Sequence, residues 1–185
     1  MINKLAVLFP GIGYHCDKPL LYYSRKLVRE MDYEIREIHY GSLPSGVKGD
    51  GAKMRQAFIQ ALEDVTEQLS NVPWSSYDDI VFISKSLGTA VAAAYAKQNA
   101  IPARQIYYTP VEASFEAIGT MGIVFHGTGD SWADTKVICQ KCKDRGIKLY
   151  LTEGANHSME TGDTIKDLEN IRNIMTQTKK YLLEM

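Results

Sequence analysis

The sequence lacks the features that mark several large classes of protein. It has three cysteines in 185 residues, an odd number with no disulfide framework, as is typical of reduced thiols in a reducing compartment. No apolar run approaches the roughly 20 residues of a membrane span. The formal net charge of -1 gives no reason to expect a nucleic acid or an anionic membrane as a partner.

The sequence also offers little for secretion, metal binding or redox chemistry. The apolar run at residues 5–9 is too short for a secretion signal and enters a Pro-Gly turn, so we interpret it as a strand of a cytoplasmic protein. Cys139 and Cys142 form a lone C-x-x-C pair, and no second pair completes a metal site. The pair falls in the middle of a predicted helix, whereas a redox motif would begin one. We predict no metal and no organic cofactor.

Short apolar runs alternate with helix-like stretches along the whole chain. Strands are predicted at residues 5–9, 33–39, 80–83, 105–108, 123–126 and 147–151, and helices at 19–30, 52–70, 88–99, 134–145 and 164–183. Such alternation predicts an α/β fold, a three-layer sandwich in which helices cover both faces of a parallel sheet of about six strands. No repeat or linker interrupts it, so residues 1–185 are predicted to form one domain.

The pentapeptide Ser84-Lys85-Ser86-Leu87-Gly88 lies between a predicted strand and a predicted helix. A serine at the tip of a strand–turn–helix is the arrangement called a nucleophile elbow, which needs small residues two positions before and after the serine. Ser84 and Gly88 meet that need, although glycine is more usual at the first position. The alternative is an ordinary turn capped by a serine.

Ligand and catalytic sites of open parallel sheets form beyond the carboxyl ends of the strands. Asp130 follows the strand at residues 123–126, and His157 follows the last strand. Ser86, Asp130 and His157 then occur in the chain order of a serine-hydrolase triad. Asp134 is the competing acid but is better placed to open the next helix, and His126 is interpreted as a packed, hydrogen-bonded histidine.

The loop after the first strand, residues 10–15, is rich in glycine. Glycines let a backbone pass close to a ligand and turn N–H groups toward it. The N–H of Ile12 or Gly13 could therefore join that of Leu87 in an oxyanion hole, although an ordinary flexible turn is an equal alternative. We expect three nearby aromatic and imidazole side chains to line the cleft: Tyr14, His15 and Trp132. The turn-rich residues 40–50 would form a wall.

Taken together, these segments resemble the α/β-hydrolase family over nearly the whole chain, most closely its small cap-less members of the dienelactone-hydrolase-like carboxylesterase type. The matching segments are Phe9-Pro10-Gly11-Ile12-Gly13, Ser84-Lys85-Ser86-Leu87-Gly88, His126-Gly127-Thr128-Gly129-Asp130 and Gly154-Ala155-Asn156-His157-Ser158-Met159-Glu160. The first strand here corresponds to the family's third, so no antiparallel edge is expected. Serine replaces the cysteine nucleophile of true dienelactone hydrolases.

The resemblance implies a serine hydrolase that cleaves a small carboxylic ester or thioester through an acyl-enzyme on Ser86, with His157 as base and Asp130 orienting it. The expected binding partner is a small-molecule acyl substrate, and the protein is expected to be either a monomer or a homodimer. Two alternatives remain open. One is a non-catalytic binding protein on the same scaffold. The other is a flavodoxin-like nucleotide binder, although the loop lacks the P-loop lysine and threonine.

Overall fold

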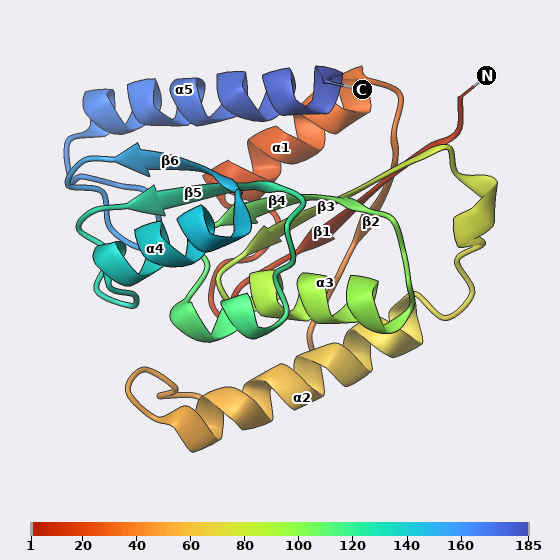
Figure 1. The fold of residues 1–185 in the computed structure, drawn as a ribbon, viewed down its shortest axis with the longest axis horizontal. Coiled ribbons are helices and arrows are strands. Elements are labelled where there is room, and N and C mark those ends of the chain that lie inside the picture. The colour runs from red at the N-terminus through yellow and green to blue at the C-terminus, as the bar shows by residue number, and fades with distance from the viewer. Residues whose placement is uncertain (1, 185) are drawn as a thin grey trace.

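The computed structural model describes residues 2–184. Its centre is a sheet of six parallel strands in the order β2-β1-β3-β4-β5-β6 (Figure 1). The strands are β1 (Lys4–Phe9), β2 (Glu34–Glu37), β3 (Asp79–Lys85), β4 (Arg104–Tyr108), β5 (Ile123–Gly127) and β6 (Lys148–Thr152). All neighbouring strands pair in parallel, which confirms the predicted sheet.

Five helices cover the two faces of this sheet (Figure 1). They are α1 (Pro19–Glu30), α2 (Gly51–Gln68), α3 (Leu87–Gln98), α4 (Thr135–Arg145) and α5 (Thr164–Leu183). Helices α1 and α5 pack against one face, together with the inward side chains of Ala6, Leu8 and Ile83. Helices α2, α3 and α4 lie on the other face. The result is the predicted three-layer α/β architecture.

Side-chain caps set the starts of three helices. The carboxylates of Asp50, Asp134 and Asp163 accept hydrogen bonds from backbone N–H groups in the first turns of α2, α4 and α5. Such caps satisfy donors that a helix start leaves free. Asp134 is therefore a helix cap, as its position in the sequence indicated. Two short 3-10 helices, η1 (Trp74–Ser76) and η2 (Glu112–Glu116), were not predicted.

The apolar side chains of α2 and α5 are buried to different extents. In α2, Met54, Phe58 and Leu62 are partly buried and pack against the core. In α2 the buried residues are Ala57, Ala61 and Val65, because this helix packs on α3 and small side chains allow close approach. In α5 the apolar side chains of Ile165 and Leu168, near its start, are 68% and 57% exposed. The core contacts of α5 begin at the partly buried Ile171 and continue through Ile174, Met175 and Leu182.

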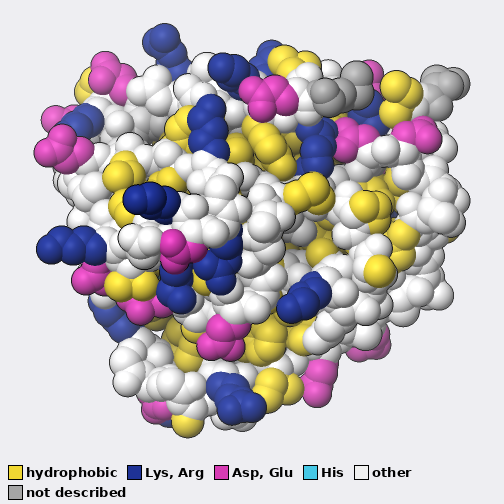
Figure 2. All heavy atoms as spheres, viewed as in Figure 1, with side chains coloured by type: hydrophobic (Ala, Val, Ile, Leu, Met, Phe, Trp, Pro, Cys, Tyr) yellow, Lys and Arg dark blue, Asp and Glu magenta, His cyan; other side chains and the backbone are white. Residues whose placement is uncertain are grey.

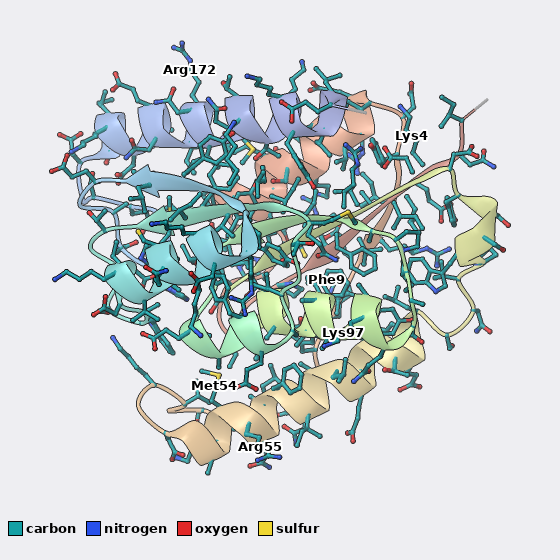
Figure 3. The ribbon with its side chains drawn as sticks, viewed as in Figure 1. Lys4, Phe9, Met54, Arg55, Lys97 and Arg172 are labelled. Carbon is teal, nitrogen blue, oxygen red and sulfur yellow. The ribbon has the colours of Figure 1, made fainter. Side chains whose placement is uncertain are left out.

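The side chains follow this layering. Phe9 lies between the sheet and α3, whereas Arg55 and Arg172 point outward from α2 and α5 (Figure 3). On the face drawn in Figure 2, basic and acidic side chains are scattered rather than gathered by sign. None of the helices within residues 2–184 is both long and apolar enough to cross a membrane.

Candidate active site

Ser86 lies at the turn between β3 and α3, with a φ of 53°. A positive φ is strained for serine and is the backbone conformation expected at a nucleophile elbow. Gly88 explains how the turn fits: a Cβ at this position would lie 2.5 Å from the carbonyl oxygens of Phe9 and Pro10. Only glycine fits there without moving the backbone of β1.

The other small position of the elbow is Ser84, which is fully buried. Its hydroxyl donates a hydrogen bond to the carbonyl oxygen of Ile106 on β4, at 3.1 Å. This bond satisfies the extra polar atom, so serine fits where glycine is more usual. Gly11 then brings the loop after β1 against the elbow, because a Cβ on Gly11 would lie 3.0 Å from that of Ser86.

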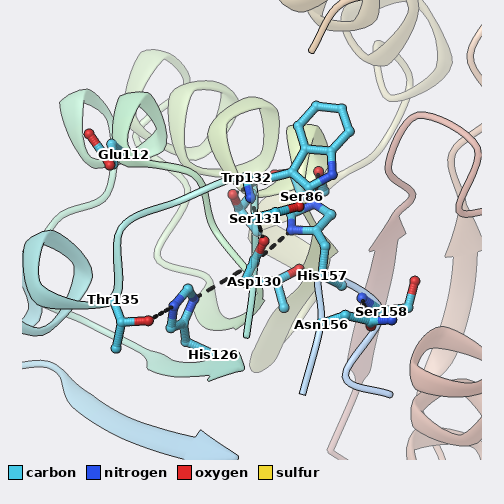
Figure 4. Close-up of polar contacts among 12 residues, drawn as sticks. Ser86, Glu112, His126, Asp130, Ser131, Trp132, Thr135, Asn156, His157 and Ser158 are labelled. Carbon is cyan, nitrogen blue, oxygen red and sulfur yellow. Dashed lines mark hydrogen bonds and ion pairs between the residues drawn. The ribbon is translucent and has the colours of Figure 1, made fainter. Parts of the chain in front are cut away.

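The loops after β5 and β6 bring two further side chains to Ser86 (Figure 4). The Nε2 atom of His157 lies 2.8 Å from the Ser86 Oγ. On the other side of the ring, Nδ1 lies 2.7 Å from the Oδ2 of Asp130. The three residues predicted from separate loops therefore form one hydrogen-bonded series, in the arrangement of a base between a nucleophile and an orienting acid.

Asp130 is enclosed, with a side chain that is 0% exposed. Its Oδ1 accepts the backbone N–H of Trp132 at 2.8 Å. Burial is the largest influence on its pKa and acts to raise it, but the hydrogen bond and charge of His157, with the Trp132 N–H, hold the pKa below its usual value. The carboxylate therefore remains ionised at neutral pH.

A second histidine stands behind this carboxylate (Figure 4). The buried His126 directs Nε2 to the Thr135 hydroxyl at 3.0 Å, and its Nδ1 lies 3.8 Å from the Asp130 Oδ2. Burial lowers the pKa of His126, so this ring is neutral. As the sequence indicated, it is a packed, hydrogen-bonded histidine, but its closeness to Asp130 had no signal in the sequence.

His157 is fixed on several sides. Its ring stacks on Trp132 with centroids 5.2 Å apart, and its backbone carbonyl accepts the Thr109 hydroxyl at 3.1 Å. Burial lowers the pKa of the imidazole, the hydrogen bond to Asp130 opposes this, and the charges of Lys85 and Lys48 lower it further. A neutral imidazole is the form that can accept a proton from Ser86.

The turn after β1 supplies candidate oxyanion donors. Gly11 and Tyr14 exchange backbone hydrogen bonds at 3.1 Å, which leaves Ile12 and Gly13 at the tip of the turn. Neither tip N–H donates to another described residue, and Leu87 is the first residue of α3, where helical N–H groups have no intrahelical acceptor. These N–H groups are free to bind an anionic oxygen.

The comparisons with known proteins agree with this arrangement of loops on a parallel sheet. No family model and no curated protein matches the sequence. Est1E from Butyrivibrio proteoclasticus, solved with ferulic acid bound, superposes with a TM-score of 0.73 at 12% identity, over 99% of this chain and 89% of that one. The chain has the α/β-hydrolase fold.

Two further structures with this fold are similar. An α/β serine hydrolase without a lid, from Xanthomonas campestris, gives a TM-score of 0.64 at 13% identity, over 100% of this chain and 85% of its own. An α/β serine hydrolase homologue from Coxiella burnetii gives 0.68 at 15% identity, over 96% and 86%. Identities this low carry the fold, as the resemblance read from the motifs implied.

Within the α/β-hydrolase fold, two hollows adjoin loops that neighbour Ser86, His157 and Asp130, although these three residues line neither hollow. One, of about 480 Å³, lies between the turn after β1 and the segment after β2, residues 37–43. The other, of about 460 Å³, is bounded by Trp132, by residues 47–51 and by residues 111–113. His15 and Trp132 line these hollows as predicted.

Tyr14 also borders the first hollow, but it is 7% exposed. Its hydroxyl accepts the backbone N–H of Leu20 at the start of α1, at 3.1 Å. Most of this side chain therefore packs inside the protein, under the turn whose residues face the cleft. The sequence predicted Tyr14 as a cleft-lining residue but gave no sign of the hydrogen bond that joins its hydroxyl to α1.

The loop at residues 40–50 reaches across the front of the site. The Nζ of Lys48 donates to the Ser131 hydroxyl at 2.7 Å and lies 5.2 Å from the centre of the Trp132 ring. Lys48 was not among the predicted site residues, because an exposed lysine in a turn-rich loop carries no pattern that points to a partner 83 positions away.

The three cysteines occupy two places in the fold, since Cys16 borders the first hollow and the other two lie in α4. All three cysteines are free, and Cys139 and Cys142 both lie within α4. Among residues 2–184, no group of three or more His, Cys, Asp or Glu side chains could hold a metal ion.

Proposed function

We propose that this protein is a serine hydrolase that cleaves a small carboxylic ester or thioester through an acyl-enzyme on Ser86. One observation carries the proposal: Ser86, His157 and Asp130 form a continuous hydrogen-bonded series with contacts of 2.8 and 2.7 Å. Such a series is the geometric requirement for activating a serine hydroxyl. The chemistry requires no metal or organic cofactor.

In the first half-reaction His157 accepts the Ser86 proton at Nε2 while the oxygen attacks the carbonyl carbon. Asp130 holds the other ring nitrogen in its protonated form and stabilises the imidazolium. The tetrahedral oxyanion is held by the N–H of Leu87 and by that of Ile12 or Gly13. Losing one such donor typically raises the barrier by about 3–4 kcal/mol.

The imidazolium then returns its proton to the leaving alcohol or thiol as the carbon–oxygen or carbon–sulfur bond breaks. Water enters, gives a proton to His157 and attacks the acyl-enzyme, and the carboxylic acid leaves as Ser86 regains its proton. The two hollows of about 480 and 460 Å³ adjoin the turn of Ile12 and the ring of Trp132. They would accept the two sides of the scissile bond.

The first test is labelling and turnover of Ser86→Ala. Wild type is expected to react with a fluorophosphonate probe and to hydrolyse short p-nitrophenyl esters, and the variant to lose both, with a fall in rate of about 10⁴-fold or more. Ser158→Ala is the matched control, because Ser158 lies beside His157 in the same loop and its hydroxyl has no role in the series. It should behave as wild type.

Equal labelling of Ser86→Ala and wild type would remove Ser86 from its role. A wild-type protein that neither labels nor hydrolyses any ester would favour the alternative of a binding protein with an idle triad. If labelling succeeds, a panel of acyl esters and thioesters of rising chain length defines the acyl group. Esters of ferulic acid belong in that panel, because Est1E was solved with this acid bound.

A further inference from the structure

Lys85, the residue before Ser86, is an unusual side chain at this position. It is 1% exposed and forms no hydrogen bond or ion pair with any described residue. It lies on the sheet face that also buries Ile83, Tyr108 and Met159. A buried ammonium without a carboxylate partner destabilises a fold, so an uncharged side chain of similar length would suit the packing better.

The one group that faces this ammonium closely is the ring of Tyr14. The Nζ of Lys85 lies 4.9 Å from the ring centre, within the range of a cation–π interaction. The Lys85 side chain also runs beneath the turn after β1, because a Cβ on Gly11 would lie 3.6 Å from its Cγ and 3.1 Å from its carbonyl oxygen. The elbow and the turn are therefore joined through Lys85.

Tyr14 is the last residue of the turn at Gly11–Tyr14, which carries the candidate oxyanion donors. Its backbone N–H and carbonyl pair with those of Gly11 at 3.1 Å, and its hydroxyl accepts the N–H of Leu20. Between Gly11 and Tyr14, Gly13 has a φ of 68°, a conformation that glycine adopts without strain. Whatever fixes the Tyr14 ring also fixes where the free N–H groups of Ile12 and Gly13 point.

We propose that Lys85 is a positioning residue, whose ammonium holds the Tyr14 ring and thereby sets the turn at Gly11–Tyr14 in the geometry that binds the oxyanion. The inference deepens the proposed function and rests on it. It also explains why a lysine occupies a buried place beside the nucleophile. Preorganised donors act because they need no rearrangement when charge develops.

The charge on Lys85 is compatible with this role. Burial lowers its pKa to about 7, and the charge of Asp130 opposes this. The groups that act on it from the surrounding elements are Asp130 after β5, His157 after β6 and the Tyr14 ring. The aromatic ring attracts the charged ammonium and not the neutral amine. The protonated form of Lys85 is therefore the one that holds the Tyr14 ring in place.

The test compares Lys85→Met with Tyr14→Leu, Tyr14→Phe and the double variant Lys85→Met/Tyr14→Leu. Methionine keeps the length of the side chain without the charge, and phenylalanine keeps the ring face without the hydroxyl. We expect Lys85→Met and Tyr14→Leu each to lower kcat about ten- to hundredfold with KM within about twofold, as a part of the loss of one oxyanion donor. The double variant should be no worse than the poorer single one, and Tyr14→Phe, which keeps the ring face but loses the bond to the Leu20 N–H, should lose less activity than Tyr14→Leu.

A second readout does not depend on catalysis. The amide hydrogens of Gly11 and Tyr14 are hydrogen-bonded to each other's carbonyls, so their exchange with deuterium reports the closure of the turn. Exchange should accelerate in Lys85→Met and Tyr14→Leu, and to a smaller extent in Tyr14→Phe. Thermal unfolding controls for folding, and Lys85→Met should unfold at the wild-type temperature or above, because it removes a buried charge.

Wild-type kcat and wild-type exchange in Lys85→Met would overturn the inference, and so would a double variant whose loss is the product of the two single losses. Loss in Tyr14→Phe equal to that in Tyr14→Leu would assign the effect to the hydroxyl instead. A wild-type protein without esterase activity would end the proposed function, whereas the exchange rates would still decide whether Lys85 holds the turn.

Discussion

The substitution Asp130→Asn tests whether the proton on the Nδ1 of His157 is essential to the candidate site. The Oδ1 position accepts the N–H of Trp132 at 2.8 Å, so the carbonyl oxygen of an asparagine would take that place. Its amide nitrogen would then occupy the Oδ2 position, 2.7 Å from the Nδ1 of His157. Two N–H groups cannot face each other there, so His157 would lose the proton on Nδ1.

A neutral His157 would then carry its proton on Nε2, directed at the Ser86 hydroxyl. In this tautomer the ring donates to the hydroxyl and cannot act as its base. A fall in kcat of about 10³–10⁴-fold is expected for such a change in a serine-hydrolase triad, which corresponds to about 4–5.5 kcal/mol of barrier. The change is nearly isosteric, so thermal unfolding should shift far less than the rate.

The assay is the hydrolysis of a p-nitrophenyl ester at neutral pH, with active sites counted by the release of the first equivalent of p-nitrophenol. Asp134→Asn is the matched control, because asparagine caps a helix as well as aspartate does, and the Asp134 carboxylate accepts its hydrogen bonds from the N–H groups of Lys136 and Val137 at its own helix start. Its kcat should not change. An Asp130→Asn enzyme that keeps more than a tenth of the wild-type kcat would refute this account of the tautomer.

The remaining predictions concern pH and packing. On the acid side, kcat/KM should rise with pH through one ionisation below 6.5, the ordinary value for histidine, because burial lowers the pKa of His157 and the base must be neutral. Above neutrality the rate should fall as Lys85, whose pKa burial lowers to about 7, loses its charge. A rate that is flat from pH 4.5 to 6.5 would contradict a histidine base. Gly88→Ala places a Cβ 2.5 Å from the carbonyl oxygens of Phe9, at the end of β1, and of Pro10. It should cost about 2–3 kcal/mol of stability, or roughly 4–12 °C in the midpoint of thermal unfolding. Gly51→Ala is its control, because a Cβ there meets nothing within 4 Å, and an equal drop in both variants would contradict the packing argument.

The parallel sheet and the meeting of Ser86, Asp130 and His157 could be predicted from the sequence for one physical reason. Parallel strands deliver the loops at their carboxyl ends to the same edge, so residues far apart in the chain become neighbours. The pattern also separated Asp130 from Asp134, since a carboxylate just before a helix is a good cap. Strand ends were less certain: β2 pairs only with β1, and its four residues are fewer than the apolar pattern indicated.

The contacts that could not be predicted depend on where single side chains end rather than on periodicity. The cation–π contact of Lys85 with Tyr14 requires both ends to be buried on the same face, and a lysine in a sequence gives no sign of burial. The bond from Lys48 to Ser131 and the approach of His126 to Asp130 likewise involve loop geometry. The exposed Ile165 and Leu168 show the converse, since an apolar stripe does not guarantee a partner surface.

The reach of Lys48 across the front of the cleft has a consequence for turnover. The exposed hydrogen bond from Lys48 to the Ser131 hydroxyl joins the loop at residues 40–50 to the loop after β5. A contact of this kind is worth about 1 kcal/mol. A single exposed hydrogen bond breaks and reforms far faster than a hinged domain opens and closes. Entry of substrate and water and exit of products would then be rapid, and the slow step would be a chemical one. For an ester with a good leaving group that step is hydrolysis of the acyl-enzyme, which gives a burst of alcohol before steady turnover.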